Sequence, residues 1–160
     1  MEKIQDYWVE PFLTLIELCK IKPNESIIVL TETRSRELNV IILEQAIKKI
    51  GLEFNKIEIP SKPYLIDPII KSTGSSNILD GNNLYIKKLK ESDIIFDLTK
   101  EGLMHSKQTK EILSSGTRIM NISDEHPEIL SRLKPDIDLK DRVKEAVSQC
   151  RSSSIMKVTS

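Results

Sequence analysis

The feature that most constrains the fold is a repeated alternation between short β-branched apolar runs and longer segments with helical periodicity. Residues 26–31, Ser-Ile-Ile-Val-Leu-Thr, are typical of a strand buried on both faces. Apolar residues then recur at helical spacing over 38–50, and Gly51 follows as a C-terminal cap. Residues 54–59 predict a second strand that ends at Pro60. Together these segments predict one β-α-β unit, whose helix buries Leu38, Ile41, Ile42, Ala46 and Ile50.

The same alternation continues through the rest of the chain. Residues 93–98 and 117–122 predict two further strands, and the segment 106–115 between them predicts a helix capped by Ser106 and Gly116. Residues 61–82, rich in Pro, Gly, Ser and Asn, predict a long irregular excursion with one short helix. The remaining expected elements are a helix before residue 26 with Pro11 at its first position, helices at 84–90, at 127–133 opened by Pro127 and at 139–150, and the start of a strand at 155–159.

Strands that alternate with helices imply a largely parallel sheet covered by helices on both faces. The sequence therefore predicts an α/β fold, a Rossmann-like three-layer sandwich. Its glycines never fall in the G-x-G-x-x-G spacing after a strand, and there is no Walker loop, so a nicotinamide cofactor is disfavoured. We expect residues 1–152 to form this domain and residues 153–160 to begin a second domain that lies outside these 160 residues.

Charge balance and cysteine content exclude several classes of function. The chain has 24 Lys and Arg against 24 Asp and Glu, so it lacks the cationic surplus of a nucleic-acid-binding surface. No apolar run approaches the ~20 residues that span a bilayer, and the Met-Glu-Lys start carries no signal-peptide core. Two cysteines cannot build a disulfide scaffold. We therefore expect a cytoplasmic domain that binds neither nucleic acid nor membrane.

Residues able to bind a metal or attack a substrate are scarce. The two histidines, His105 and His126, stand in no metal-binding spacing, and the sequence gives no sign that they converge. Cys19 and Cys150 each fall on an apolar helix face, which favours core packing over a role as nucleophile or ligand. The sequence alone shows no complete catalytic or metal site.

His105 is the candidate functional residue. It lies in the loop that leaves the strand 93–98, and ligands bind at the carboxyl ends of strands in open α/β sheets. A helix beginning at Ser106 would disfavour the imidazolium form and leave a neutral ring able to accept a proton. The alternative is that His105 only caps or packs the entrance of that helix.

Other side chains have both a functional and a structural interpretation. Asp97, at a strand end, is either a site acid or a hydrogen-bond acceptor for the loop. Arg118 is expected to form a structural bridge with a helix carboxylate, and His126 to be an ordinary helix-start residue. Four more residues remain open in the same way: Arg34 and Arg36 as anion ligands or a solvated turn, and Tyr7 and Trp8 as core or an interface anchor.

Four segments, taken in their order and spacing, resemble the N-terminal domain of the 2,5-dihydroxypyridine 5,6-dioxygenases. Thermophilic leucyl-aminopeptidase-type metallopeptidases share this architecture. The most specific parts are the His-Ser pair, the Gly-Thr-Arg-Ile run and the Pro-Glu-x-Leu run. The segments are residues 18–30, residues 93–98, His105-Ser106 with residues 112–119, and residues 127–133 followed by Pro135 and Arg142-Val143.

The resemblance implies an enzyme considerably longer than this chain. A second domain, which residues 153–160 would begin, would bind Fe(II) in a dioxygenase or a pair of divalent metals in a peptidase. His105 would face that metal across the domain cleft and act as acid/base. The implied reaction is an extradiol-type cleavage of a hydroxylated N-heteroaromatic ring by Fe(II) and O2, in a homo-oligomer that takes a small aromatic substrate. These 160 residues alone would bind no cofactor and would be inactive.

Two other functions remain open. The first is the N-terminal domain of a leucyl-aminopeptidase-like metallopeptidase, which a carboxylate-rich rather than a histidine-rich metal site would favour. The second is a non-catalytic binding or assembly module that is complete in 160 residues. If a second domain is missing, we expect an exposed apolar face where it docks, and hence association of the chain or poor solubility.

Overall fold

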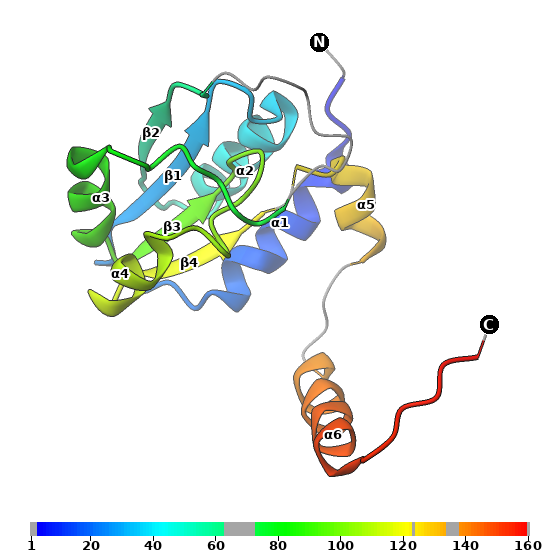
Figure 1. Ribbon diagram of the computed structural model, residues 1–160. Coiled ribbons are helices and arrows are strands. Elements are labelled where there is room, and N and C mark those ends of the chain that lie inside the picture. Colours follow the sequence, from blue (N-terminus) through cyan, green and yellow to red (C-terminus); the bar gives the residue numbers. More distant parts are fainter. Residues whose placement is uncertain (1–2, 63–72, 123, 134–137, 160) are drawn as a thin grey trace.

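The computed structural model describes residues 3–62, 73–122, 124–133 and 138–159. Within these ranges six helices alternate with four strands (Figure 1). In chain order they are α1 (Asp6–Leu18), β1 (Ile27–Glu32), α2 (Glu37–Lys49), β2 (Asn55–Ile59), α3 (Asn83–Lys90), β3 (Ile94–Asp97), α4 (Thr109–Ser114), β4 (Arg118–Asn121), α5 (Pro127–Arg132) and α6 (Leu139–Ser152).

The four strands form one parallel sheet in the order β2-β1-β3-β4. The chain therefore moves outward from β1 to β2 and then returns to the other side of β1 for β3. This reversal between β1 and β3 is a topological switch point, the place where open α/β sheets bind ligands at the carboxyl ends of their strands. The predicted α/β fold with a parallel sheet is confirmed.

Two apolar cores, one on each face, hold helices against this sheet. Trp8, Phe12 and Ile16 of α1 and the buried face of α2 pack with Val29 and Phe96 on one face. On the other face, the side chains that pack with Ile95 come from the strands, from α3 and α4 and from the loops between them: Ile28, Leu30, Ile59, Ile78, Leu79, Ile86, Leu89, Leu103 and Ile112. Every residue of β1 is buried, as expected for a central strand covered on both faces. The result is the predicted three-layer sandwich (Figure 1).

Helix α1 begins earlier than its proline predicts. Pro11 lies in the helix interior rather than at its first position, and it lacks the N–H that would bond back along the helix. Trp8 is only 4% exposed and its indole N–H donates to Glu128 Oε2 at 3.0 Å. This tertiary contact anchors the first turn, so the helix extends on both sides of the proline.

The buried face of α2 is rotated from the predicted one. Ile50 is 46% exposed and Leu38 and Ile41 are only half-buried, whereas Asn39 is buried and its side-chain amide donates to the Glu125 carbonyl at 2.9 Å. The polar contact of Asn39 turns that side of the helix inward. The side chains that α2 buries are Asn39, Val40, Ile42, Leu43, Ala46 and Ile47.

Helix α6 has the predicted apolar stripe but buries none of it. All of its residues are exposed, including Val143 at 50% and Cys150, so the expected core packing of Cys150 is wrong for this structure. Figure 1 shows α6 and the tail after it standing apart from the sheet. Residues 155–159 form no strand, because no neighbouring strand lies beside them to supply hydrogen bonds.

Two further expectations concern the segment between β2 and α3 and the crossing of a membrane. Residues 63–72 of the irregular excursion at 61–82 lie outside the described residues, and its described part, 61–62 and 73–82, contains turns but no helix. None of the described helices is both long and apolar enough to cross a membrane.

Candidate active site

The switch point is flanked by two buried carboxylates. Glu32 ends β1 and Asp97 ends β3, and both side chains are almost inaccessible, at 3% and 0% exposure. Leu30 of β1 pairs with Asp97 in the parallel register, so the two strand ends lie side by side. The loop that leaves β3 passes directly over them.

Asp97 holds that loop through three hydrogen bonds. The N–H and the hydroxyl of Thr99 donate to Oδ1 at 3.0 and 2.7 Å, and the N–H of Leu103 donates to Oδ2 at 2.7 Å. Burial raises the pKa of Asp97 to about 6, against the lowering effect of these donors. Of the two interpretations left open by the sequence, the geometry fits the loop acceptor.

Glu32 holds the same loop from the neighbouring strand. Its Oε1 accepts the N–H of Lys100 at 2.7 Å, and its Oε2 accepts the hydroxyl of Ser61 at 2.6 Å. The backbone of the loop is therefore held at the ends of both strands. The exposed His105 lies farther along this loop.

His105 lies on the outer part of the loop against a second segment, residues 73–76. The N–H of Gly74 donates to the Glu101 carbonyl at 2.6 Å, and the His105 N–H donates in turn to the Gly74 carbonyl. Gly74 has φ +72°, and a Cβ placed there would stand 3.0 Å from Cδ2 of His105. The ring thus lies directly against a glycine whose missing side chain leaves it room.

The His105 side chain is exposed at the edge of a surface hollow of about 430 Å³. Within the described part of the chain, neither ring nitrogen has a hydrogen-bond or ion-pair partner. The other residues that line the hollow are both polar and apolar: Met104, Ser106, Thr109, Lys110, Leu113 and Ser114. An imidazole with both nitrogens available beside such a hollow can exchange a proton with a bound molecule.

The predicted helix start beside His105 is wrong. Helix α4 begins at Thr109, and the Ser106 hydroxyl donates to the Ser76 carbonyl at 2.6 Å instead of capping the helix. The Ser106 hydroxyl, which the sequence predicted to cap the helix, thus bonds to a residue that is distant in sequence. The argument that an adjacent helix N-terminus keeps His105 neutral therefore fails, whereas its placement at the carboxyl end of the sheet is correct.

His126 has the structural role that the sequence predicts. It is the N-cap of α5, and its Nδ1 accepts the N–H of Glu128 at 3.2 Å. Its ring packs edge-on against Trp8, with the centroids 5.0 Å apart. Glu128 also accepts the Tyr7 hydroxyl at 2.6 Å, and these hydrogen bonds lower its pKa to about 2. Trp8 is thus a core residue, and the exposed Tyr7 joins the same contact between α1 and α5.

Of the two arginines of the first turn, Arg36 contacts another loop through its side chain and Arg34 through its backbone. Arg36 donates from Nε to the Asp124 carbonyl at 3.0 Å, which ties the start of α2 to the loop after β4. The Arg34 N–H donates to the Ser61 hydroxyl at 3.1 Å. The turn is therefore a set of contacts between loops at the carboxyl edge of the sheet.

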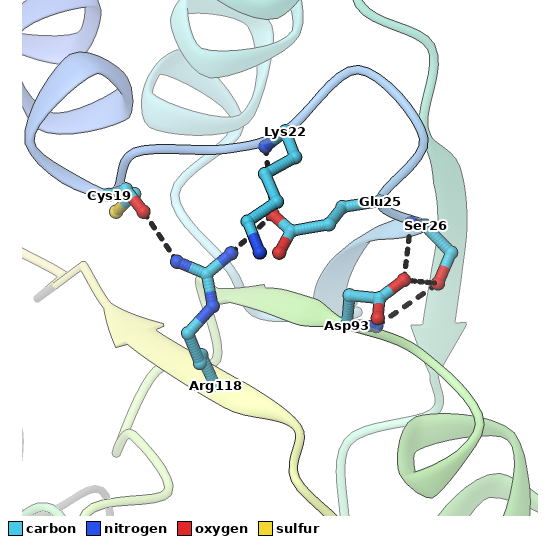
Figure 2. A network of polar contacts seen from close by, with 6 residues as sticks. All are labelled: Cys19, Lys22, Glu25, Ser26, Asp93 and Arg118. Atoms are coloured by element: carbon cyan, nitrogen blue, oxygen red, sulfur yellow. Dashed lines mark hydrogen bonds and ion pairs between the residues drawn. The ribbon is translucent and has the colours of Figure 1, made fainter.

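Arg118 forms its predicted structural bridge at the end of the sheet opposite to His105, where the strands begin (Figure 2). Its guanidinium donates to the Cys19 carbonyl and pairs with Glu25, which lies in the loop before β1 rather than on a helix. Beside it, the N–H and hydroxyl of Ser26 donate to Asp93 and lower the pKa of that carboxyl.

A hollow of about 460 Å³ borders this network; of the two carboxylates that line it, Glu25 and Glu53, Glu25 is already paired with Arg118. Cys19 is half-buried against the core, and burial raises the pKa of its thiol, which fits packing rather than reactivity. Unlike the loop of His105, this edge presents no exposed imidazole.

A metal centre does not fit the residues that the structure describes. They contain no group of three or more His, Cys, Asp or Glu side chains able to hold a metal ion. The two histidines take part in different contacts, His105 against Gly74 and His126 against Trp8.

Comparison with known proteins places this fold and this loop in a family. Residues 7–160 match the family described as 2,5-dihydroxypyridine 5,6-dioxygenase. The chain belongs to this family. The resemblance to the N-terminal domain of the 2,5-dihydroxypyridine 5,6-dioxygenases is thereby confirmed.

Two relatives show how much of the family's length the chain represents. The 2,5-dihydroxypyridine 5,6-dioxygenase of Pseudomonas putida strain KT2440 is 26% identical over 151 residues, which cover 93% of this chain and 42% of that protein. The solved structure of 2,5-dihydroxypyridine dioxygenase from the same strain matches with a TM-score of 0.79 at 24% identity, over 94% of this chain and 44% of that chain. The chain thus spans less than half the length of these two dioxygenases.

Two residues of the site escaped sequence reasoning. Glu32 carries the same signal as Asp97, a carboxylate at the end of a buried strand, but it falls in a charged turn that suggested solvent exposure. Gly74 lies in a Ser- and Gly-rich stretch without periodicity, and its contact with His105 spans 31 positions of the chain. No local sequence pattern predicts a contact between residues 31 positions apart.

Proposed function

We propose that this chain is the N-terminal domain of an enzyme like the 2,5-dihydroxypyridine 5,6-dioxygenases, and that His105 is its acid/base. The reaction would be an Fe(II)-dependent, extradiol-type cleavage of a hydroxylated N-heteroaromatic ring. The observation that carries the proposal is the exposed imidazole of His105 at the carboxyl end of the switch-point strand, on a chain that belongs to this family.

The role proposed for His105 is proton transfer to and from a substrate hydroxyl. Its side chain is exposed beside a hollow, and both ring nitrogens lack hydrogen-bond partners among the described residues. An imidazole is suited to this task because one ring nitrogen can accept a proton while the other donates one.

Iron would be bound by residues outside this chain, because the described residues provide no metal cage. When bound there, iron would supply the activation of O2 and of the ring. This chain would contribute the wall of the cleft and the proton. Because the chain covers only 42% of the P. putida dioxygenase, the rest of such an enzyme has room for a metal-binding domain.

The test is a chimera in which this chain replaces the matching segment of the P. putida dioxygenase. His105→Asn is compared with His126→Asn, since asparagine cannot titrate at either position but is a good helix N-cap at the second. We expect ring cleavage of 2,5-dihydroxypyridine to fall about 10²- to 10⁴-fold in the His105 variant only, with iron content unchanged in both.

Two results would reject parts of the proposal. Unchanged turnover of the His105→Asn chimera at full iron content would remove this residue from the mechanism. A comparable loss of turnover in the His126→Asn chimera, at full iron content, would show that the loss does not identify an acid/base.

A further inference from the structure

We propose that Asp97 and Gly74 position the His105 ring: Asp97 fixes the loop that carries it, and Gly74 forms the surface on which it rests. This inference rests on the proposed function for its importance, because an acid/base must be held in one orientation to transfer a proton efficiently. Its structural content can be tested independently of any reaction.

The first link runs from Asp97 to the loop backbone. The carboxylate accepts hydrogen bonds from Thr99 and from Leu103, at the two ends of a short arc. Leu103 is fully buried, and its carbonyl accepts the Ser106 N–H at 3.0 Å. The backbone is thus held on both sides of His105, at Leu103 and at Ser106.

The second link runs from the loop to residues 73–76. With the arc held, the carbonyls of Glu101 and Gly102 accept the N–H groups of Gly74 and Ser76 at 2.6 and 2.8 Å. The Glu101 carboxylate, itself buried, also accepts the Thr73 N–H at 2.8 Å. The segment 73–76 is therefore held against the loop by the loop's own backbone.

The third link is the contact between Gly74 and the ring. The Gly74 carbonyl accepts the His105 N–H, and its α-carbon faces Cδ2 of the ring. A methyl group at this position would stand 3.0 Å from Cδ2 and 3.7 Å from Nε2, so any larger residue must displace the ring. Gly74 thus lies against the Cδ2–Nε2 side of the ring.

The test uses proton NMR of the 160-residue chain, whose two histidines give separable imidazole signals. The reporter is the nuclear Overhauser cross-peak between His105 Hδ2 and the Gly74 α-protons. We expect this cross-peak in the parent chain and its loss in Asp97→Asn, because asparagine has one accepting oxygen and its amide nitrogen cannot accept the N–H on its own side, from either Thr99 or Leu103. The indole and imidazole signals of Trp8 and His126 should not change.

A matched control lies at the other end of the same strand. Asp93 accepts the N–H and hydroxyl of Ser26 in a comparable way, but at the edge of the sheet shown in Figure 2. Asp93→Asn should therefore lower stability without affecting the His105 cross-peak. Loss of the cross-peak in both variants would indicate a general loosening of the fold and would overturn the positioning role of Asp97, as would its survival in Asp97→Asn.

Glycine substitutions test the ring contact in the same way. Gly74→Ala and Gly81→Ala impose the same kind of backbone strain, since φ is +72° and +81°, but nothing lies within 4 Å of a Cβ at Gly81. We expect the His105 ring signals to shift in the first variant only. Equal effects of the two substitutions would overturn the role of Gly74.

Thr99→Val is the alternative if Asp97→Asn does not fold. It removes the 2.7 Å hydroxyl bond to Oδ1 and preserves the side-chain shape. The cross-peak should weaken, and an unchanged cross-peak would count against the proposal. The NMR experiments measure no turnover. They can therefore contradict the positioning of the His105 ring without contradicting the proposed function, and the chimera experiment can do the reverse.

Discussion

Glu32 and Asp97 end adjacent parallel strands, and each accepts a backbone N–H from the same loop, Lys100 for Glu32 and Leu103 for Asp97. Two carboxylates buried this close repel each other, and the loop amides compensate part of that cost. The loop is thereby held at both strand ends, and the hollow at His105 lies farther along it.

The burial of Asp97 predicts an unusual pH dependence of stability. Its pKa in the folded state is about 6 against an ordinary value of 3.8, so the folded chain binds the proton more tightly than the unfolded chain. The free energy of unfolding of the parent relative to Asp97→Asn should therefore rise as pH falls from 7 to 4, by about 3 kcal/mol. Urea unfolding monitored by fluorescence of the single Trp8 measures this difference.

Asp93→Asn is the control with the opposite sign. The pKa of Asp93 is lowered by Ser26, so the parent should lose stability relative to this variant as the pH falls through and below 3.8. If the two aspartates gave the same slope, the assignment of Asp97 as a carboxyl destabilised by burial would be wrong.

The contact between α1 and α5 depends on the charge of Glu128. Its pKa is lowered to about 2, first by the Tyr7 hydroxyl and then by Trp8, so its contribution to stability is present above pH 4.5 and lost as pH falls toward 2. Glu128→Gln should lower stability at pH 7 and change Trp8 fluorescence. Glu17→Gln, on the exposed side of α1, serves as the control and should do neither.

The apolar stripe of α6 predicts self-association of the isolated chain. Val143 and Val147 are 50% and 42% exposed, and Ile155 and Met156 after the helix are more exposed still. Val143→Glu with Val147→Lys replaces the stripe by a favourable i,i+4 pair and should give a monomer. Ser148→Lys, on the other side of the helix, should leave association unchanged. Sedimentation of the parent as a monomer at high concentration would contradict this prediction.

The isolated chain should not bind Fe(II) tightly. Its described residues offer no group of three suitable side chains, so anaerobic Fe(II) should leave the Tm of the chain unchanged. Calorimetric titration under the same conditions checks the result. Stoichiometric binding that His105→Ala abolishes would show that this chain itself supplies a metal ligand.

The local pattern of the sequence determined the elements and their order. β-branched runs such as 26–31 and helical spacing such as 38–50 predict strands and helices because burial on a regular backbone repeats with a fixed period. The parallel sheet follows, because strands separated by helices must cross over to pair. His105 and Asp97 could also be placed at the carboxyl edge of the sheet from sequence alone.

Only the tertiary structure decided which partner each polar group takes. Ser106 donates to Ser76 rather than to the start of α4, and Trp8 holds α1 in place on both sides of Pro11. His105 lies against Gly74 across 31 positions of sequence. Such contacts have no period along the chain, because they depend on how distant loops meet once the sheet has brought them together.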